Sequence, residues 1–220
     1  MKRIGFLHEQ IVSEENCRLA IINAAKHKKK RRNVQKVMDN LDFYAKDLSE
    51  RLVRLDFTSP YRTRIIKDGL SGKERELQIP AFYPDQCAHH AIVQVLQPLI
   101  MKSSYYWSCA NIPNRGIDRA AKGVERATMR DIKHAKYCVK MDIHKFYPSI
   151  PHDKLKEHLQ RKIKDKKALG IIHLVIDSYH SSPGHGIPIG NYTSPWLAEF
   201  YLQSLDYFIK QTLMIYIRIL

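Results

Sequence analysis

Residues 137–150 read YCVKMDIHKFYPSI, and this stretch carries the most specific local pattern of the 220-residue chain. Its first residues form a nearly continuous apolar run, which predicts a buried strand over 137–143. Asp142 comes where that strand emerges, so its carboxylate is expected at the edge of a sheet. Magnesium in phosphoryl-transfer sites is commonly bound by one or two carboxylates together with substrate phosphates. Asp142 is therefore a candidate metal ligand, and the alternative is an ordinary turn or capping residue.

The second informative stretch lies toward the C-terminus, where residues 186–206 read GIPIGNYTSPWLAEFYLQSLD. Three glycines and two prolines fall within residues 183–190, which predicts a tight, irregular loop. Asn191 and Thr193 follow, and they can cap the next helix or contact a template strand. Glycine lets a backbone approach a ligand closely, so the loop is a candidate binding element. The alternative is a structural turn followed by a capped helix.

Helices and one hairpin are predicted elsewhere. Residues 14–55 lack glycine and proline and have apolar residues at helical intervals, which predicts one or two amphipathic helices. Residues 58–80 predict two short strands around a turn that contains glycine. A helix is expected over 85–99, with Pro98 marking its end. Further helices are predicted at 116–134, 151–163, 171–179 and 196–213, and a last strand at 214–220. In the last helix the residues expected on the buried side are Leu197, Phe200, Tyr201, Leu205, Phe208 and Ile209.

Composition favours a polyanionic partner. The chain has 37 Lys and Arg against 22 Asp and Glu, a formal net charge of +15, and nucleic acid is the first candidate for such a surface. An anionic membrane is the competing partner, but the basic residues are spread along the chain instead of flanking one apolar helix. The four cysteines form no CxxC pair, and the eleven histidines form no HExxH pattern. We therefore expect a cytoplasmic protein with reduced thiols and no membrane partner.

The densest positive charge lies in the segment 26–32, KHKKKRR, which has six cations and one histidine. Such a run is too dense to be neutralised by its own neighbours. Its candidate phosphate-contacting residues are Lys28, Lys29, Lys30, Arg31 and Arg32. The alternative is an ordinary solvated helix face or loop.

In four ordered blocks, the sequence resembles bacterial reverse transcriptases of the kind encoded by group II introns, diversity-generating retroelements and retrons. GKERELQIPAFYPDQCAHHAIVQVLQPLI resembles the family's fingers block, and SYYWSCANIPNRGIDRAAKGVE resembles the next. YCVKMDIHKFYPSI resembles the first palm motif, and GIPIGNYTSPWLAEFYLQSLD the loop-and-helix motif after it. The resemblance spans about residues 70–206, and the basic N-terminal helices also look like the family's leader region.

The resemblance implies roles for individual residues. Asp142 matches the aspartate that binds both magnesium ions, and the Ile143 carbonyl is the usual backbone ligand beside it. Tyr147 matches the aromatic residue under the deoxyribose, where a rigid ring excludes a 2′-hydroxyl by sterics. Lys73 and Arg75 match basic fingers residues near the incoming triphosphate. Arg115 and Gly116 match the turn against the template, while Pro188, Ile189, Gly190 and Asn191 match the loop beside nucleotide and template.

One part of the family pattern has no match. In the family, a strand after the last helix delivers a Tyr-x-Asp-Asp sequence that completes the two-metal site, whereas here the chain reads IYIRIL. Neither Asp206, Glu199 nor Asp153 is expected on a strand adjacent to Asp142. The thumb is also without a counterpart, so a truncated, frame-shifted or split gene product is expected, and this chain alone should be inactive.

The fold implied is α/β (α+β): the fingers and an incomplete palm of a right-hand polymerase, with a basic helical N-terminal arm. Residues 1–58 should form that arm and 59–220 the reverse transcriptase domain, with fingers at 59–135 and a partial palm at 136–220. The implied activity is magnesium-dependent RNA-directed DNA synthesis. The implied partners are an RNA template, a DNA primer, deoxynucleoside triphosphates and a second polypeptide that supplies the rest of palm and thumb. The alternative is a noncatalytic RNA-binding remnant or a subunit of a retroelement ribonucleoprotein.

Overall fold

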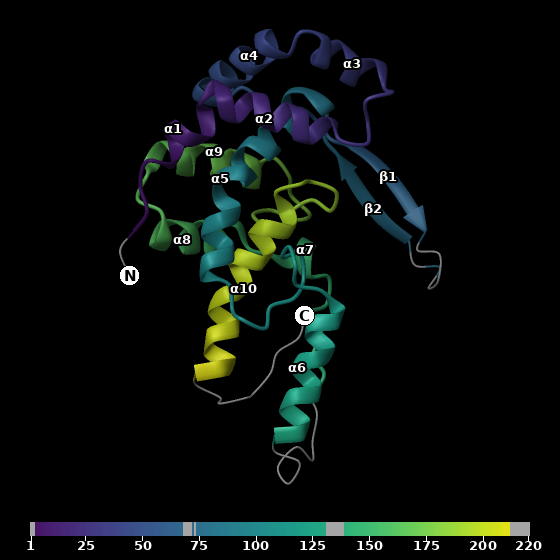
Figure 1. Cartoon of the computed structure of the whole chain (residues 1–220), viewed down its shortest axis with the longest axis vertical. Coiled ribbons are helices and arrows are strands. Elements are labelled where there is room, and N and C mark those ends of the chain that lie inside the picture. The colour runs from purple at the N-terminus through teal and green to yellow at the C-terminus, as the bar shows by residue number, and fades with distance from the viewer. Residues whose placement is uncertain (1–2, 68–71, 73, 131–138, 212–220) are drawn as a thin grey trace. The chain divides into compact units, whose positions relative to one another are not determined.

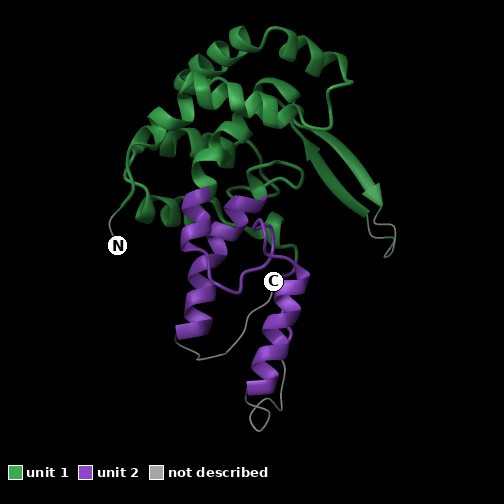
Figure 2. Cartoon of the chain, viewed as in Figure 1, with its two compact units in different colours: residues 1–97, 145–194 green, residues 98–144, 195–220 purple. Residues whose placement is uncertain are grey.

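The computed structural model describes residues 3–67, 72, 74–130 and 139–211 and has a helix-rich, mixed architecture with one small sheet (Figure 1). The chain divides into two compact units (Figure 2). Unit 1 comprises residues 1–97 and 145–194, and unit 2 comprises residues 98–144 and 195–220. Unit 1 is therefore built from two separate stretches of sequence. The predicted domain divisions at residues 58 and 135 stay predictions.

Four helices form the N-terminal part of unit 1: α1 (Leu7–Val12), α2 (Glu14–Ala25), α3 (Arg32–Asp39) and α4 (Leu41–Arg54). Ser13 begins α2, and its side chain accepts a hydrogen bond from the Asn16 backbone. Apolar residues on α2 and α4, such as Ile21 and Leu48, are fully buried. The predicted helical character of residues 14–55 is confirmed. The stretch forms three helices, whereas one or two were predicted. Residues 26–31 of the basic run form the turn between α2 and α3, and Arg32 begins α3.

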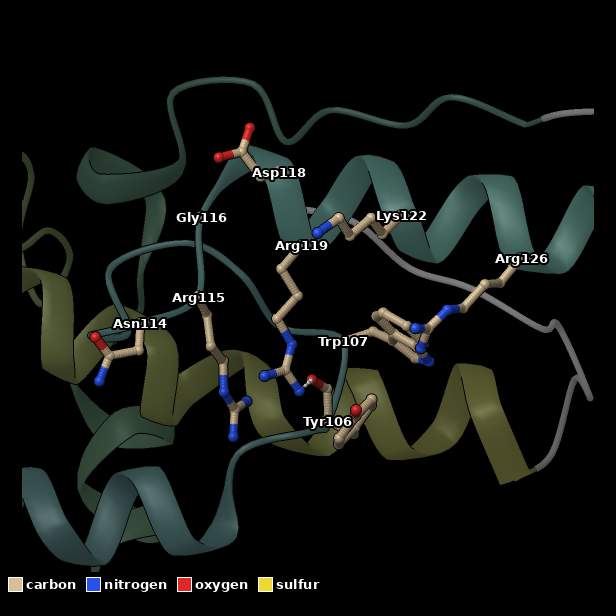
Figure 3. A pocket seen from close by; sticks show the side chains of 9 residues that line it. All are labelled: Tyr106, Trp107, Asn114, Arg115, Gly116, Asp118, Arg119, Lys122 and Arg126. Atoms are coloured by element: carbon tan, nitrogen blue, oxygen red, sulfur yellow. Dashed lines mark hydrogen bonds between the residues drawn. The ribbon is translucent and has the colours of Figure 1, made fainter.

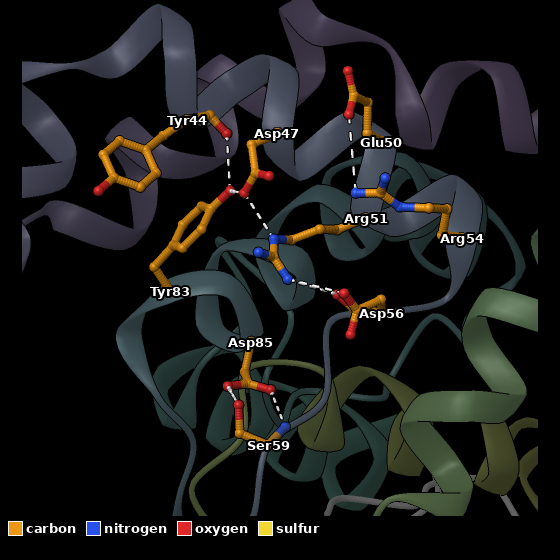
Figure 4. Close-up of polar contacts among 9 residues, drawn as sticks. All are labelled: Tyr44, Asp47, Glu50, Arg51, Arg54, Asp56, Ser59, Tyr83 and Asp85. Carbon is orange, nitrogen blue, oxygen red and sulfur yellow. Dashed lines mark hydrogen bonds and ion pairs between the residues drawn. The ribbon is translucent and has the colours of Figure 1, made fainter.

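Hydrogen bonds anchor the end of α4 and the chain after it to residues 83–85 (Figure 4). Tyr83 donates to Asp47, which also accepts from Arg51. Burial alone would raise the pKa of Asp47, but these two hydrogen bonds together with the positive charges of Arg51 and Arg54 hold that pKa below its usual value. Asp85 accepts hydrogen bonds from the Ser59 backbone and hydroxyl at 2.6 and 2.8 Å. These bonds fix the chain just before the hairpin.

The predicted hairpin is present, with β1 (Arg62–Lys67) paired antiparallel to β2 (Glu74–Ile79). Arg64 lies opposite Leu77 in the register. Most of the hairpin is exposed, and the exception is Gln78 on β2, which is 6 % exposed. The hairpin is therefore held by its base, near Gln78.

The second stretch of unit 1 carries α7 (Phe146–Ser149), α8 (His152–Lys162) and α9 (Lys166–Asp177). Asp165 caps α9 by accepting a hydrogen bond from the Ala168 backbone at 3.1 Å. Its other carboxylate oxygen accepts from the backbones of Leu7 and His8, both at 2.9 Å. One aspartate thus caps two helices that are far apart in the sequence. Ile4 adds a bridge to Ile163 beside them.

Helix α5 (Cys87–Ser103) follows a short π-helical segment, η1 (Phe82–Gln86), and continues through Pro98. The prediction that Pro98 ends this helix was wrong. Pro98 is exposed, and the turn after it is supported by α10 (Ser194–Gln211), because Gln203 donates to the Ile100 carbonyl at 3.2 Å. Tertiary contacts can offset the hydrogen bond that a proline removes from a helix.

Unit 2 also contains α6 (Ile117–Arg130) and the larger part of α10. Glu199 is buried on α10, and both of its carboxylate oxygens lie 2.8 Å from the Ser108 hydroxyl, which donates its single proton to that carboxylate. Two residues expected on the buried side of α10, Leu205 and Phe208, are instead 39 % and 49 % exposed. Among the described residues, every helix is too short or too polar to cross a lipid bilayer.

The predicted strand at 137–143 was wrong over residues 139–143, which have no strand partner and are exposed. An isolated apolar segment cannot satisfy its backbone as a strand without a neighbouring strand. Residues 137–138 and the predicted last strand at 214–220 lie outside the described residues.

Candidate nucleotide and nucleic-acid site

The loop formed by residues 186–191 docks directly on β2. The Gln78 backbone N–H donates to the Ile189 carbonyl at 2.8 Å. Gly190 has a φ of +118°, and a Cβ atom on it would lie 2.8 Å from the Gln78 carbonyl oxygen. Only glycine fits this backbone conformation at this separation. The glycine singled out in the sequence therefore brings the loop against the strand that carries Arg75.

The same loop is fixed on its other side by the segment around α7. Ile187 donates to the Tyr147 carbonyl at 3.0 Å, and Gly186 donates to the Ile150 carbonyl at 2.8 Å. The buried ring of His152 lies 2.7 Å from the Gly186 carbonyl through Nε2. Burial raises the pKa of the half-buried Tyr147 phenol. The structure therefore brings Arg75, Tyr147, Ile189 and Gly190 into one unit.

Asn191 has a supporting position within this arrangement. It is 3 % exposed and donates to the Tyr61 hydroxyl at 2.8 Å, and that hydroxyl lies 2.7 Å from the Ser178 hydroxyl. Pro188 is also buried. Neither side chain is open to solvent, so their predicted template contact stays a prediction. Lys73, predicted to bind the triphosphate, lies outside the described residues.

Sequence reasoning missed Tyr61 and His152, which hold this loop in place. A signal for His152 was present, since it follows Pro151 at the start of a predicted helix. Nothing near Tyr61 in the sequence connects it with Asn191, because the two residues are 130 positions apart.

Arg115 and Gly116 lie in unit 2, immediately before α6. Arg115 donates to the carbonyls of Tyr105 and Ser108 at 2.9 and 3.3 Å, so its guanidinium braces the loop that precedes it. Arg115 and Gly116 line an open cavity of about 610 Å³, together with two aromatic side chains and further cations of α6 (Figure 3). The cavity contributes a basic and aromatic surface that the sequence analysis had not singled out.

Asp142 and Ile143 lie in the exposed segment before α7. The exposed carboxylate fits a magnesium ion that keeps water and substrate phosphates as its other ligands. Among the residues that the structure describes, no group of three or more acidic, histidine or cysteine side chains could hold a metal ion. The assignment of Asp142 and the Ile143 carbonyl as magnesium ligands stays a prediction.

The basic run does not behave as one uniform surface. Lys28 donates to the Gln86 side chain at 2.8 Å, and burial lowers the pKa of its ammonium group. Lys29, Lys30, Arg31 and Arg32 are exposed. These four remain candidates for phosphate contact, whereas Lys28 is held against the protein.

More than half of the chain matches one known protein family. Residues 67–217 match the family described as "Reverse transcriptase (RNA-dependent DNA polymerase)". The chain belongs to the reverse transcriptase family. This match begins at the last residue of β1 and covers β2, Arg115, Gly116, Asp142 and the 186–191 loop. The family predicted from the four sequence blocks is therefore confirmed.

Similar curated proteins come from introns. The chain is 27% identical over 184 residues to the "Uncharacterized 91 kDa protein in cob intron" of Schizosaccharomyces pombe, covering 78% of this chain and 22% of that protein. It is 29% identical over 165 residues to the "Group II intron-encoded protein LtrA" of Lactococcus lactis subsp. cremoris, covering 72% of this chain and 26% of that protein. The "Putative COX1/OXI3 intron 2 protein" of Saccharomyces cerevisiae is 30% identical over 88 residues, covering 35% and 10%. The chain spans about a quarter of the first two relatives.

Proposed function

We propose that the chain provides the fingers and the first palm motif of an RNA-directed DNA polymerase, which adds deoxynucleotides to a primer 3′-hydroxyl. The proposal is supported chiefly by the 186–191 loop, which is hydrogen-bonded both to β2 and to the Tyr147 segment. Three elements assigned to nucleotide binding thus meet within unit 1. In a fold of this family, that convergence is what a site for one incoming nucleotide requires.

Each of these elements has a distinct proposed task. Arg75 on β2 would bond the triphosphate, because a guanidinium can contact phosphate oxygens in pairs. The Tyr147 ring would lie under the sugar and exclude a 2′-hydroxyl by sterics. Gly190 would let the loop backbone approach the nucleotide without a side chain in between.

Asp142 and the Ile143 carbonyl would hold magnesium, which supplies charge neutralisation at the transferring phosphate. Asp142 would orient the metal-bound triphosphate toward the primer terminus. The sequence contains no Tyr-x-Asp-Asp, and Glu199 is already hydrogen-bonded to Ser108. We therefore propose that residues 1–220 by themselves do not extend a primer.

The nucleotide site is tested by the lifetime of a labelled RNA-template–DNA-primer complex. The complementary deoxynucleotide with magnesium should slow dissociation of the complex, and a mismatched one should not. Arg75→Ala should remove this effect, while Arg64→Ala on the neighbouring strand serves as a matched control. Equal lifetimes with matched and mismatched nucleotides would contradict the proposed site.

The proposed lack of independent activity is tested by primer extension with magnesium on an RNA template. Incorporation by the wild-type chain should not exceed that of Asp142→Ala. Incorporation that depends on Asp142 would show that the polypeptide already holds a complete site.

A noncatalytic RNA-binding role is the second candidate, favoured by the basic and aromatic cavity of unit 2. It predicts RNA binding whose affinity falls with salt, in proportion to the phosphates neutralised. Asp142→Ala should leave that affinity unchanged, and the complementary deoxynucleotide should have no effect on complex lifetime. The lifetime measurement therefore separates the two functions.

A further inference from the structure

The cavity of unit 2 combines cations and aromatic rings on one side of α6. Arg119, Lys122 and Arg126 recur at the three- and four-residue spacing that places side chains on one helix face. Figure 3 shows the Arg119 and Arg126 side chains extending toward the loop that carries Tyr106 and Trp107, whereas Lys122 lies along the helix and Asp118 points away from them. With Arg115, the cavity has four cations and one carboxylate in its lining. Its field favours an anion.

The two aromatic rings are held in defined positions. The Arg119 guanidinium carbon lies 4.3 Å from the centre of the Tyr106 ring and 6.0 Å from that of Trp107. Arg119 also donates to the Tyr106 carbonyl at 3.1 Å. The Tyr106 ring is perpendicular to that of Trp107, with their centroids 4.9 Å apart. A rigid ring beside fixed cations is a preorganised binding surface.

Gly123 of α6 allows the Trp107 ring to lie directly on the helix. A Cβ atom at Gly123 would be 2.7 and 2.8 Å from two atoms of the indole ring. Glycine disfavours a helix by roughly 1 kcal/mol relative to alanine. The close approach of the Trp107 ring explains why glycine stands at this helical position, because a larger residue would collide with the ring. The helix supports one part of the ring, and the half-buried Trp107 still lines the open cavity.

Neither Lys122 nor Arg126 forms an ion pair with a residue that the structure describes. Their charges are thus available to an external anion. A cavity of about 610 Å³ lies in the size range of small-molecule sites. Stacking rings beside phosphate-binding cations is the combination by which proteins bind single-stranded nucleic acid.

We propose that this cavity binds an unpaired nucleotide of a single strand, with the base on the Trp107 ring and the phosphate on Lys122 and Arg126. The inference extends the proposed polymerase function, since the strand would be its RNA template or its DNA product. The two sources share one chemistry, a base flanked by phosphates, and duplex nucleic acid does not offer it because its bases are stacked and paired.

The test measures binding of fluorescently labelled eight-nucleotide strands to the purified chain. The probes are oligouridine, oligodeoxythymidine and an abasic strand of the same length and charge. Trp107→Leu should weaken binding of both base-containing strands by roughly 5-fold or more, the effect of losing one stacked base. It should leave the abasic strand unaffected. Tighter binding of oligouridine would identify the template, and equal or tighter binding of oligodeoxythymidine would include the product.

A second variant separates the cavity from helix stability. Gly123→Ala keeps every charge and favours the helix, but its Cβ displaces the Trp107 ring, so it should reproduce the loss seen with Trp107→Leu. Gly170→Ala on α9 is the matched control, since a Cβ there meets nothing within 4 Å. It should bind as the wild type does.

The proposal would be overturned if the abasic and base-containing strands bound equally well. It would also be overturned if both Trp107→Leu and Gly123→Ala kept wild-type affinity. Either result would indicate that the cavity binds any polyanion without contacting the bases. These outcomes are independent of the proposed nucleotide site, because that site is tested through Arg75 and the complementary deoxynucleotide. A chain that fails one test can therefore still pass the other.

Discussion

Gly190→Ala should break the docking of the 186–191 loop on β2. The substitution places a Cβ 2.8 Å from the Gln78 carbonyl oxygen and forces alanine to a φ of +118°. Backbone strain of this kind costs about 1–3 kcal/mol. If the loop moves away instead, the hydrogen bond from Gln78 to Ile189 is lost, which costs about 1 kcal/mol. Whichever response costs less, unit 1 should lose roughly 1–3 kcal/mol of unfolding free energy.

The loss is measured by thermal unfolding followed by circular dichroism. For a chain of this size, each kcal/mol lowers Tm by roughly 2–4 °C, so Gly190→Ala should lower it by about 2–12 °C. The matched control is Gly170→Ala, inside helix α9 with open space around it, which should raise Tm slightly. If Gly190→Ala and its control have the same Tm, the close contact between loop and strand is refuted.

Three further outcomes are expected. Asp165→Ala should lower the unfolding free energy by about 1–2 kcal/mol in urea titrations, since it removes the cap of two helices; an unchanged midpoint would contradict the double cap. Burial lowers the pKa of His89 from 6.5 to about 3, so protonation opposes folding: stability should fall as pH drops from about 6.5 toward 3, and His89→Gln should flatten that dependence. Burial raises the pKa of Cys17 to about 12, and Cys87 shifts in the same direction for the same main reason. Both thiols should resist alkylation at pH 8 until the chain is unfolded, as mass spectrometry would show.

The local elements were predictable from the sequence wherever short-range patterns determine them. Glycine between two β-prone runs predicted the hairpin, and the helical spacing of Val34, Val37 and Leu48 predicted buried faces that the structure confirms. The family was also predictable, because motif order is a property of the sequence. In the candidate site, Gly190 could be singled out since only glycine tolerates its backbone geometry.

The remaining features depend on contacts that no local pattern reports. Pro98 does not end its helix, because Gln203 supports the turn after it from more than 100 positions away. The apolar run before Asp142 favoured a strand, yet residues 139–143 have no strand beside them. The cavity around Trp107 was missed because its aromatic pair and its cations belong to different predicted elements. The sequence did contain one indication of this cavity. Trp107 is followed by Gly123 and by the basic residues Arg119, Lys122 and Arg126 at helical spacing.

The double cap at Asp165 has a consequence for how the protein is made. Leu7 and His8 leave the ribosome long before Asp165 is synthesised, and α1, the helix they begin, cannot acquire its cap from Asp165 until then. The segment 98–144 emerges in between and belongs to the other unit. Completion of unit 1 therefore requires closure of a long chain loop, which slows folding relative to a protein with neighbouring contacts. During translation the N-terminal helices should expose apolar surface for many seconds, and they are the natural place for a chaperone to bind.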